Sequence, residues 1–118
     1  KIVDMAIERW FPEEFRAQSP DLMNECRSQQ LKNSVKGYVG ACQAIQSADF
    51  TDELSKIECE TLVINGIKDI STPPSLGKEL AGLLPNSNFK ILEGIGHVPP
   101  LQDPDLTVKI IKEFLSEN

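Results

Sequence analysis

The chain has 118 residues, of which 40% are hydrophobic and 25% are charged, and its formal net charge is −6. This length fits one domain, or part of one, with a modest core. The acidic balance argues against a nucleic-acid-binding protein, which normally presents a basic face, and no apolar run approaches the roughly 20 residues that cross a membrane.

The cysteines and the first residue of the chain indicate its cellular compartment and its relation to a longer protein. Three cysteines, Cys26, Cys42 and Cys59, form no C-x-x-C pair and leave an odd number. This usage favours reduced thiols in a cytoplasmic protein, and no secretory signal is present. Because a buried cysteine usually acts as a small packing residue, none is assigned as a nucleophile. The chain begins with Lys1 rather than Met, which fits a piece of a longer protein.

The first 56 residues are predicted to be helical. Apolar residues recur at helical spacing from Ile2 to Trp10, and Pro12 then breaks the run. A second helix is expected to begin at Pro20, and a third to cover Val35–Ser47. The third helix contains several glycines and alanines, which predict either close packing against another surface or the lining of a cavity.

Residues 57–118 read as strand, helix, strand and helix. The apolar run Thr61–Asn65 has the character of a buried parallel strand. Thr72 is predicted to cap the following helix, with Pro73 at its first position. Phe89–Leu92 is the second strand, and Asp103 with the proline after it starts the last helix. A crossover of normal hand makes the strands parallel. Since two strands make a poor sheet, further strands are expected from outside this sequence or from another chain.

Each predicted strand ends in a glycine turn that presents one ionisable residue. Asp69 follows the first strand, and His97, the single histidine of the chain, follows the second. Alone, each residue also fits a local role, as a surface histidine or as an aspartate that binds backbone amides at a helix start. Together they fit the orienting acid and the general base of a nucleophile–His–Asp triad. Ligands of open α/β sheets bind at this edge.

Several segments resemble the carboxyl-terminal signature of α/β-hydrolase enzymes, in which the acid precedes the histidine. The resemblance rests on Gly66–Asp69, Thr72–Pro74 and Gly94–Pro99. The upstream segments Trp10–Arg16, Gly37–Ile45 and Ala48–Phe50 are similar to the helical cap of 3-oxoadipate enol-lactonases. The resemblance therefore implies an α/β fold, with a cap segment at residues 1–56 and the carboxyl-terminal part of the hydrolase core at residues 57–118.

The resemblance also implies an activity. Such an enzyme opens a small-molecule lactone or ester in aromatic catabolism, without a metal or an organic cofactor. A serine attacks the carbonyl carbon, His97 takes the serine proton, and Asp69 orients His97. Trp10 is a candidate for contact with the substrate under the cap, although a tryptophan at helical spacing is more often a core residue.

The nucleophile of that family is missing. Its serine lies in a G-x-S-x-G turn, and none of the nine serines here has glycines on both sides at that spacing. Ser75 comes nearest, with Gly77 on one side and Pro73 on the other. The nucleophile is therefore expected from a missing amino-terminal half or from another copy of the chain. Two alternatives remain: a non-catalytic module that self-associates or binds a ligand, and part of another esterase or haloperoxidase-like hydrolase.

Overall fold

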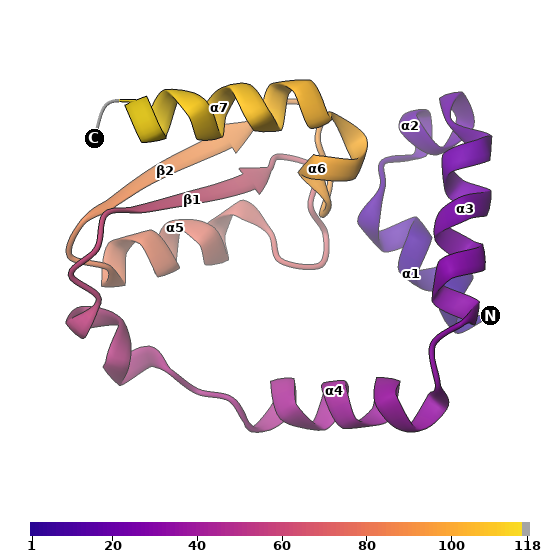
Figure 1. The fold of residues 1–118 in the computed structure, drawn as a ribbon, viewed down its shortest axis with the longest axis horizontal. Coiled ribbons are helices and arrows are strands. Elements are labelled where there is room, and N and C mark those ends of the chain that lie inside the picture. The colour runs from indigo at the N-terminus through magenta and orange to yellow at the C-terminus, as the bar shows by residue number, and fades with distance from the viewer. Residues whose placement is uncertain (117–118) are drawn as a thin grey trace.

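The computed structural model describes residues 1–116 and divides into a helical part and a part with a small sheet (Figure 1). Its helices are α1 (Ile2–Trp10), α2 (Glu13–Gln18), α3 (Pro20–Leu31), α4 (Val35–Ser47), α5 (Pro74–Leu83), α6 (Pro99–Gln102) and α7 (Pro104–Ser116). A 3-10 helix, η1 (Thr51–Lys56), precedes the strands β1 (Thr61–Gly66) and β2 (Ser87–Leu92). None of the helices described is long and apolar enough to cross a membrane.

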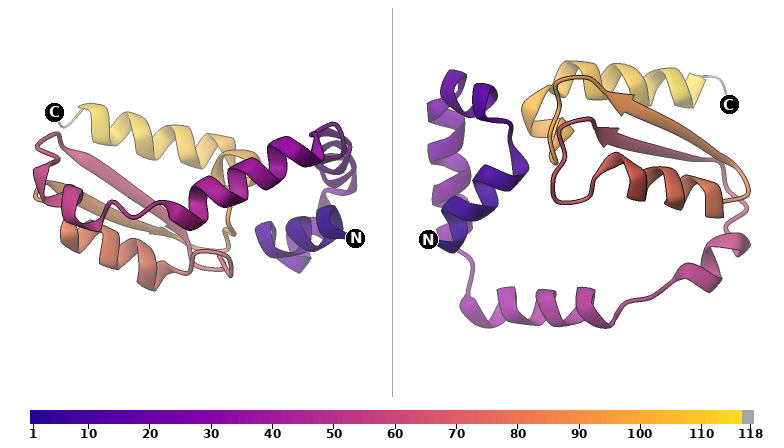
Figure 2. Two further views of the ribbon diagram at one scale, coloured as in Figure 1. Left: turned by 90° about the horizontal axis from the view of Figure 1, so that it is seen from below. Right: turned by 180° about the vertical axis from the view of Figure 1, so that it is seen from behind.

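The two strands are parallel, as the sequence predicts, and Thr61 pairs with Ser87 at the start of the register. In Figures 1 and 2, α5 lies on one face of the sheet and α7 on the other. The buried residues between α7 and the sheet are Leu92, Ile95 and Ile110. This layering brings the carboxyl ends of both strands to one edge, where α6 begins.

Helices α1–α3 form a second small core beyond that edge (Figure 1). Its buried residues are Ile7, Phe11 and Met23, and Val98 from the turn before α6 packs against them. The α1–α3 group therefore contacts the segment that follows β2, although the two are far apart in the sequence.

Helix α4 differs from the expectation of close packing. Every residue of α4 is exposed, and a Cβ added at Gly40 would meet open space. Ser34 caps the helix by accepting the Gly37 N–H. The exposed apolar side chains of α4 include Val35, Tyr38, Val39 and Ile45. The helix thus forms from its cap and its propensity, and Val35 and Tyr38 line a cavity together with side chains of α1 and α3.

The prediction that Thr72 caps α5 is wrong. Helix α5 begins at Pro74, its N-cap residue is Pro73, and no side chain caps it. Pro73 has a ψ angle of 158°, the extended value that a following proline favours. The helix therefore starts one residue later than expected, which leaves the Thr72 hydroxyl group available for another contact.

Candidate active site at the strand ends

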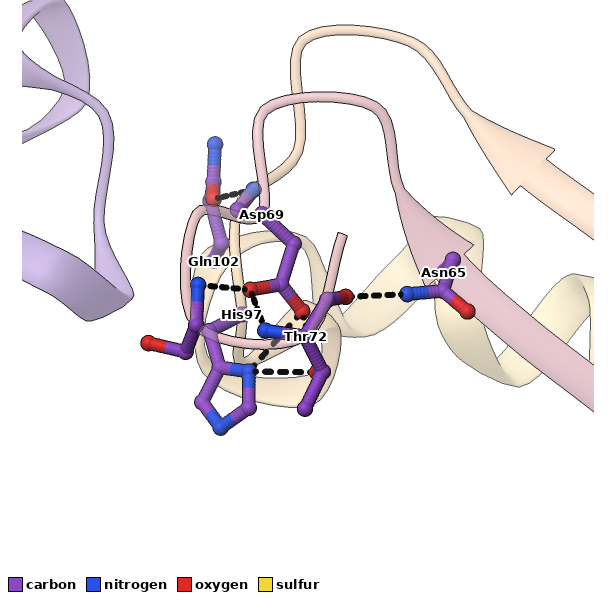
Figure 3. Close-up of polar contacts among 7 residues, drawn as sticks. Asn65, Asp69, Thr72, His97 and Gln102 are labelled. Carbon is purple, nitrogen blue, oxygen red and sulfur yellow. Dashed lines mark hydrogen bonds and ion pairs between the residues drawn. The ribbon is translucent and has the colours of Figure 1, made fainter. Parts of the chain in front are cut away.

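Asp69 and His97 lie side by side at the carboxyl ends of β1 and β2 (Figure 3). The Nδ1 atom of His97 is 2.8 Å from Oδ2 of Asp69. The Asp69 side chain is 4% exposed and that of His97 is 31% exposed. The second ring nitrogen, Nε2, points away from Asp69 in Figure 3. A carboxylate that accepts the Nδ1–H leaves Nε2 free to take a proton from a bound group.

The Asp69 carboxylate is held by four donors. Oδ1 accepts the backbone N–H groups of Ser71 at 2.8 Å and Thr72 at 2.9 Å, and Oδ2 accepts the Thr72 hydroxyl group at 2.9 Å besides contacting His97. Burial alone raises the pKa of Asp69, but the hydrogen bonds from His97, Thr72 and Ser71 outweigh it, so the pKa lies below its usual value. The carboxyl group is therefore ionised and acts only as an acceptor.

Asp69 makes the contacts that both of the alternatives left open by the sequence require. It binds the local amides of Ser71 and Thr72, and it also reaches His97. The two roles are compatible because each uses a different carboxylate oxygen for its strongest contact.

The turn that carries His97 is held by hydrogen bonds on two sides. Gln102 accepts the Gly96 N–H through Oε1 at 2.8 Å and donates through Nε2 to the Gly94 carbonyl at 2.9 Å. On the other side, the His97 N–H donates to the Trp10 carbonyl at 2.8 Å. Gly94 has a φ angle of +72°, which favours glycine. Gly96 has no such angle; a Cβ there would overlap the Trp10 carbonyl, so this glycine allows α1 to approach.

Two cavities adjoin these residues. One of about 300 Å³ is lined by Asp69, Thr72, His97 and neighbouring residues of β1 and α5. The other, of about 580 Å³, is lined mainly by apolar side chains of α1, α3 and α4, and Trp10 and Ser71 are among its lining residues. The larger volume is within the range of small-molecule sites.

The remaining candidates do not join the pair. No serine hydroxyl group within residues 1–116 contacts His97, and Ser75 lies in the first turn of α5. Burial raises the pKa of the Cys26 thiol, which disfavours the reactive thiolate. The described residues contain no group of three His, Cys, Asp or Glu side chains that could hold a metal ion.

Sequence reasoning missed three polar contacts that shape the site. They are the hydroxyl group of Thr72 on Asp69, the clamp of Gln102 on the histidine turn, and the bond from Asn65 Nδ2 to the Thr72 carbonyl at 2.9 Å. Asn65 is only 8% exposed, and a polar residue within a buried strand signals a required partner. That signal was present in the sequence.

Known proteins share this arrangement of elements. No protein-family model matches the sequence. The chain is 29% identical over 103 residues to 3-oxoadipate enol-lactonase 2 of Acinetobacter baylyi. This match covers 87% of this chain and 38% of that relative. Among solved structures, the enol-lactonase of Burkholderia xenovorans LB400 superposes with a TM-score of 0.93 at 27% identity. A thermophilic esterase of Thermogutta terrifontis, solved with malate bound, superposes with a TM-score of 0.90 at 28% identity.

The structural matches cover 98% of this chain but only 44% of the enol-lactonase chain and 43% of the esterase chain. The chain therefore spans about two fifths of the length of these relatives. The chain has the fold of the carboxyl-terminal part of an α/β-hydrolase, and its sequence resembles that part of the 3-oxoadipate enol-lactonases.

Proposed function

We propose that this chain supplies the acid–base pair of a serine-type hydrolase that acts on a lactone or ester. The observation that carries the proposal is the 2.8 Å contact between His97 Nδ1 and Asp69 Oδ2 at the carboxyl ends of parallel strands. The relatives of this chain include two enol-lactonases of Acinetobacter baylyi, which supports the proposal. The sequence offers no nucleophile of its own, so the serine and the groups that bind the oxyanion belong to another segment.

In the proposed reaction, Nε2 of His97 takes the proton of the serine hydroxyl group as its oxygen attacks the carbonyl carbon. Asp69 holds the ring and stabilises the imidazolium that forms. The tetrahedral intermediate collapses, and His97 returns the proton to the leaving oxygen. Water, activated by His97, then hydrolyses the acyl-enzyme in a second round of the same steps. Every proton transfer passes through one ring nitrogen.

The partner that we propose is a nucleophile-bearing segment with additional strands. The sheet within residues 1–116 has two strands, so its strand edges can pair with additional strands. The cavity beside His97 is lined by Val63 and Gly66 of β1, so it opens beside that strand. The exposed apolar side chains of α4 provide a second surface for the same partner.

Complementation tests this function. This chain is co-expressed with the amino-terminal three fifths of 3-oxoadipate enol-lactonase 2 of Acinetobacter baylyi. Complex formation is measured by size-exclusion chromatography. We expect the complex, and neither part alone, to hydrolyse an enol-lactone or a p-nitrophenyl ester. A well-folded complex that hydrolyses neither substrate would contradict the proposal. Activity on the simple ester alone would place the enzyme among the esterases.

The second candidate is a module that self-associates without catalysis. The open edge of β1 favours it, because unpaired strand edges recruit other strands. In that case light scattering of the isolated chain shows a dimer, and substitution of His97 leaves the function of the protein in the cell unchanged. A monomer in solution would exclude this version.

We further propose that residues 1–56 act as a cap and that Trp10 contacts the substrate in the cavity of about 580 Å³. Arg9 is the only charged side chain lining that cavity within residues 1–116, although the chain as a whole carries more acidic than basic residues. A guanidinium group among apolar side chains suits a substrate that carries a carboxylate. The malate in the related esterase structure agrees with an anionic ligand.

Trp10 is the single tryptophan of the chain, so its fluorescence reports occupancy of this cavity. We expect monomethyl adipate, which keeps one carboxylate, to bind about tenfold more tightly than neutral dimethyl adipate. Arg9→Gln should remove the difference, and Lys78→Gln on the distant helix α5 should retain it. Equal binding of both esters to the unmodified chain would exclude the role of Arg9.

A further inference from the structure

The Thr72 hydroxyl group has a contact that local helix chemistry does not require. Because α5 begins at Pro74 without a side-chain cap, this hydroxyl group does not serve the helix. It lies 2.9 Å from Asp69 Oδ2 and 3.3 Å from His97 Nδ1. Among the described residues, Thr72 is the one side chain that reaches both members of the pair (Figure 3).

We propose that Thr72 is a positioning residue that holds the Asp69 carboxylate in the orientation that keeps the His97 proton on Nδ1. The inference deepens the proposed function and rests on His97 acting as its base. Oδ1 is already fixed by the backbone N–H groups of Ser71 and Thr72. Two donors on Oδ1 still allow the carboxylate plane to turn, and the Thr72 hydroxyl group on Oδ2 fixes that plane independently of the His97 ring, which contacts the same oxygen.

The pattern of donors and acceptors around Nδ1 supports this assignment. Since the Asp69 carboxylate is ionised, it only accepts hydrogen bonds, and the shorter contact directs the Thr72 proton to Oδ2. The lone pairs of Thr72 Oγ1 then face Nδ1. The Nδ1 atom therefore meets two acceptors, and only a protonated Nδ1 satisfies them. Nε2 remains without a proton, as a general base requires.

Residue 72 is itself anchored to the sheet. Asn65 of β1 donates from Nδ2 to the Thr72 carbonyl at 2.9 Å. A Cβ at Gly77 would overlap Asn65 Oδ1, so the absence of a side chain there gives Asn65 its place beside α5. The orientation of Asp69 is thus set by a continuous path of contacts from β1 through Asn65 and Thr72.

The test uses the isolated chain labelled with ¹⁵N-histidine. Because His97 is the single histidine, a multiple-bond proton–nitrogen spectrum in alkaline buffer, where an imidazole ring is uncharged, reports its tautomer directly. We expect the unmodified chain to show the Nδ1–H tautomer. Thr72→Val, which has the same shape without the hydroxyl group, should raise the Nε2–H fraction several-fold, and Thr72→Ser should restore the original spectrum.

Two further variants define the scale. Asp69→Asn presents an amide donor to Nδ1 and should show mainly the Nε2–H tautomer. Thr107→Val removes another hydroxyl group, which donates to the Asp103 carbonyl at 2.8 Å, and should leave the spectrum unchanged. An unchanged tautomer in Thr72→Val, or the same change in Thr72→Ser, would overturn the proposal. If Thr72→Val fails to fold, Thr72→Ala gives the same comparison. No substrate is involved, so the result is independent of the complementation assay.

Discussion

Replacing Asp69 by asparagine is expected to lower kcat of the assembled hydrolase about 10⁴-fold without unfolding it. Asparagine keeps the size of the side chain and can still accept the N–H groups of Ser71 and Thr72 through its oxygen. At the second position it places an amide donor 2.8 Å from Nδ1, where the carboxylate accepted the hydrogen bond from the Nδ1–H group. The ring is then held with its proton on Nε2, and no lone pair faces the serine.

Kinetics of the complemented enzyme check this prediction. His97→Ala should lower kcat by at least as much, and the double substitution should be no worse than His97→Ala alone, because the two residues act as one unit. Asp103→Asn is the matched control. Asp103 Oδ1 accepts the Leu106 N–H at 2.9 Å at the start of α7, and asparagine caps a helix equally well. Retention of more than a tenth of kcat in Asp69→Asn would contradict the assigned role.

Local sequence rules predicted the strand–helix–strand–helix order and the parallel pair well. The reason is that each element there is specified by its own residues: a β-branched run for β1, and Asp103 with the following proline for α7. The cap of α7 is confirmed by the bond from the Leu106 N–H to Asp103. Helix α6 was not predicted, because a four-residue helix shows no periodicity.

The parts of the site that the sequence did not predict depend on contacts between distant residues. Gly96 admits the Trp10 carbonyl from α1, because a Cβ at this position would overlap that carbonyl. The bond from the His97 N–H to that carbonyl joins residues 87 positions apart. No local pattern specifies such a contact, because it arises only when α1–α3 pack around Val98. The histidine turn is therefore shaped partly by the helical segment.

Packing at Gly66 predicts the largest effect on stability. Gly66 ends β1, and a Cβ there would overlap the carbonyl oxygens of Ile95 and Gly96. These are backbone atoms of the histidine turn, which cannot move aside as a flexible side chain can. The same turn is tied to the β1 end by the Lys68 N–H, which donates to the Ile95 carbonyl at 2.9 Å. We therefore expect Gly66→Ala to lower the free energy of unfolding by about 3 kcal/mol.

Urea unfolding measures this change, and Gly82→Ala is its control. Gly82 lies within α5, where a Cβ would meet open space, so alanine should raise the free energy of unfolding by about 0.5–1 kcal/mol. The same exchange of glycine for alanine is thus expected to change the free energy of unfolding in opposite directions at two sites of one chain. Because the overlap at Gly66 pushes the turn away from β1, it should also separate His97 from Asp69 and raise the Nε2–H fraction. A stable Gly66→Ala variant with an unchanged histidine spectrum would contradict the close packing of the His97 turn against the end of β1.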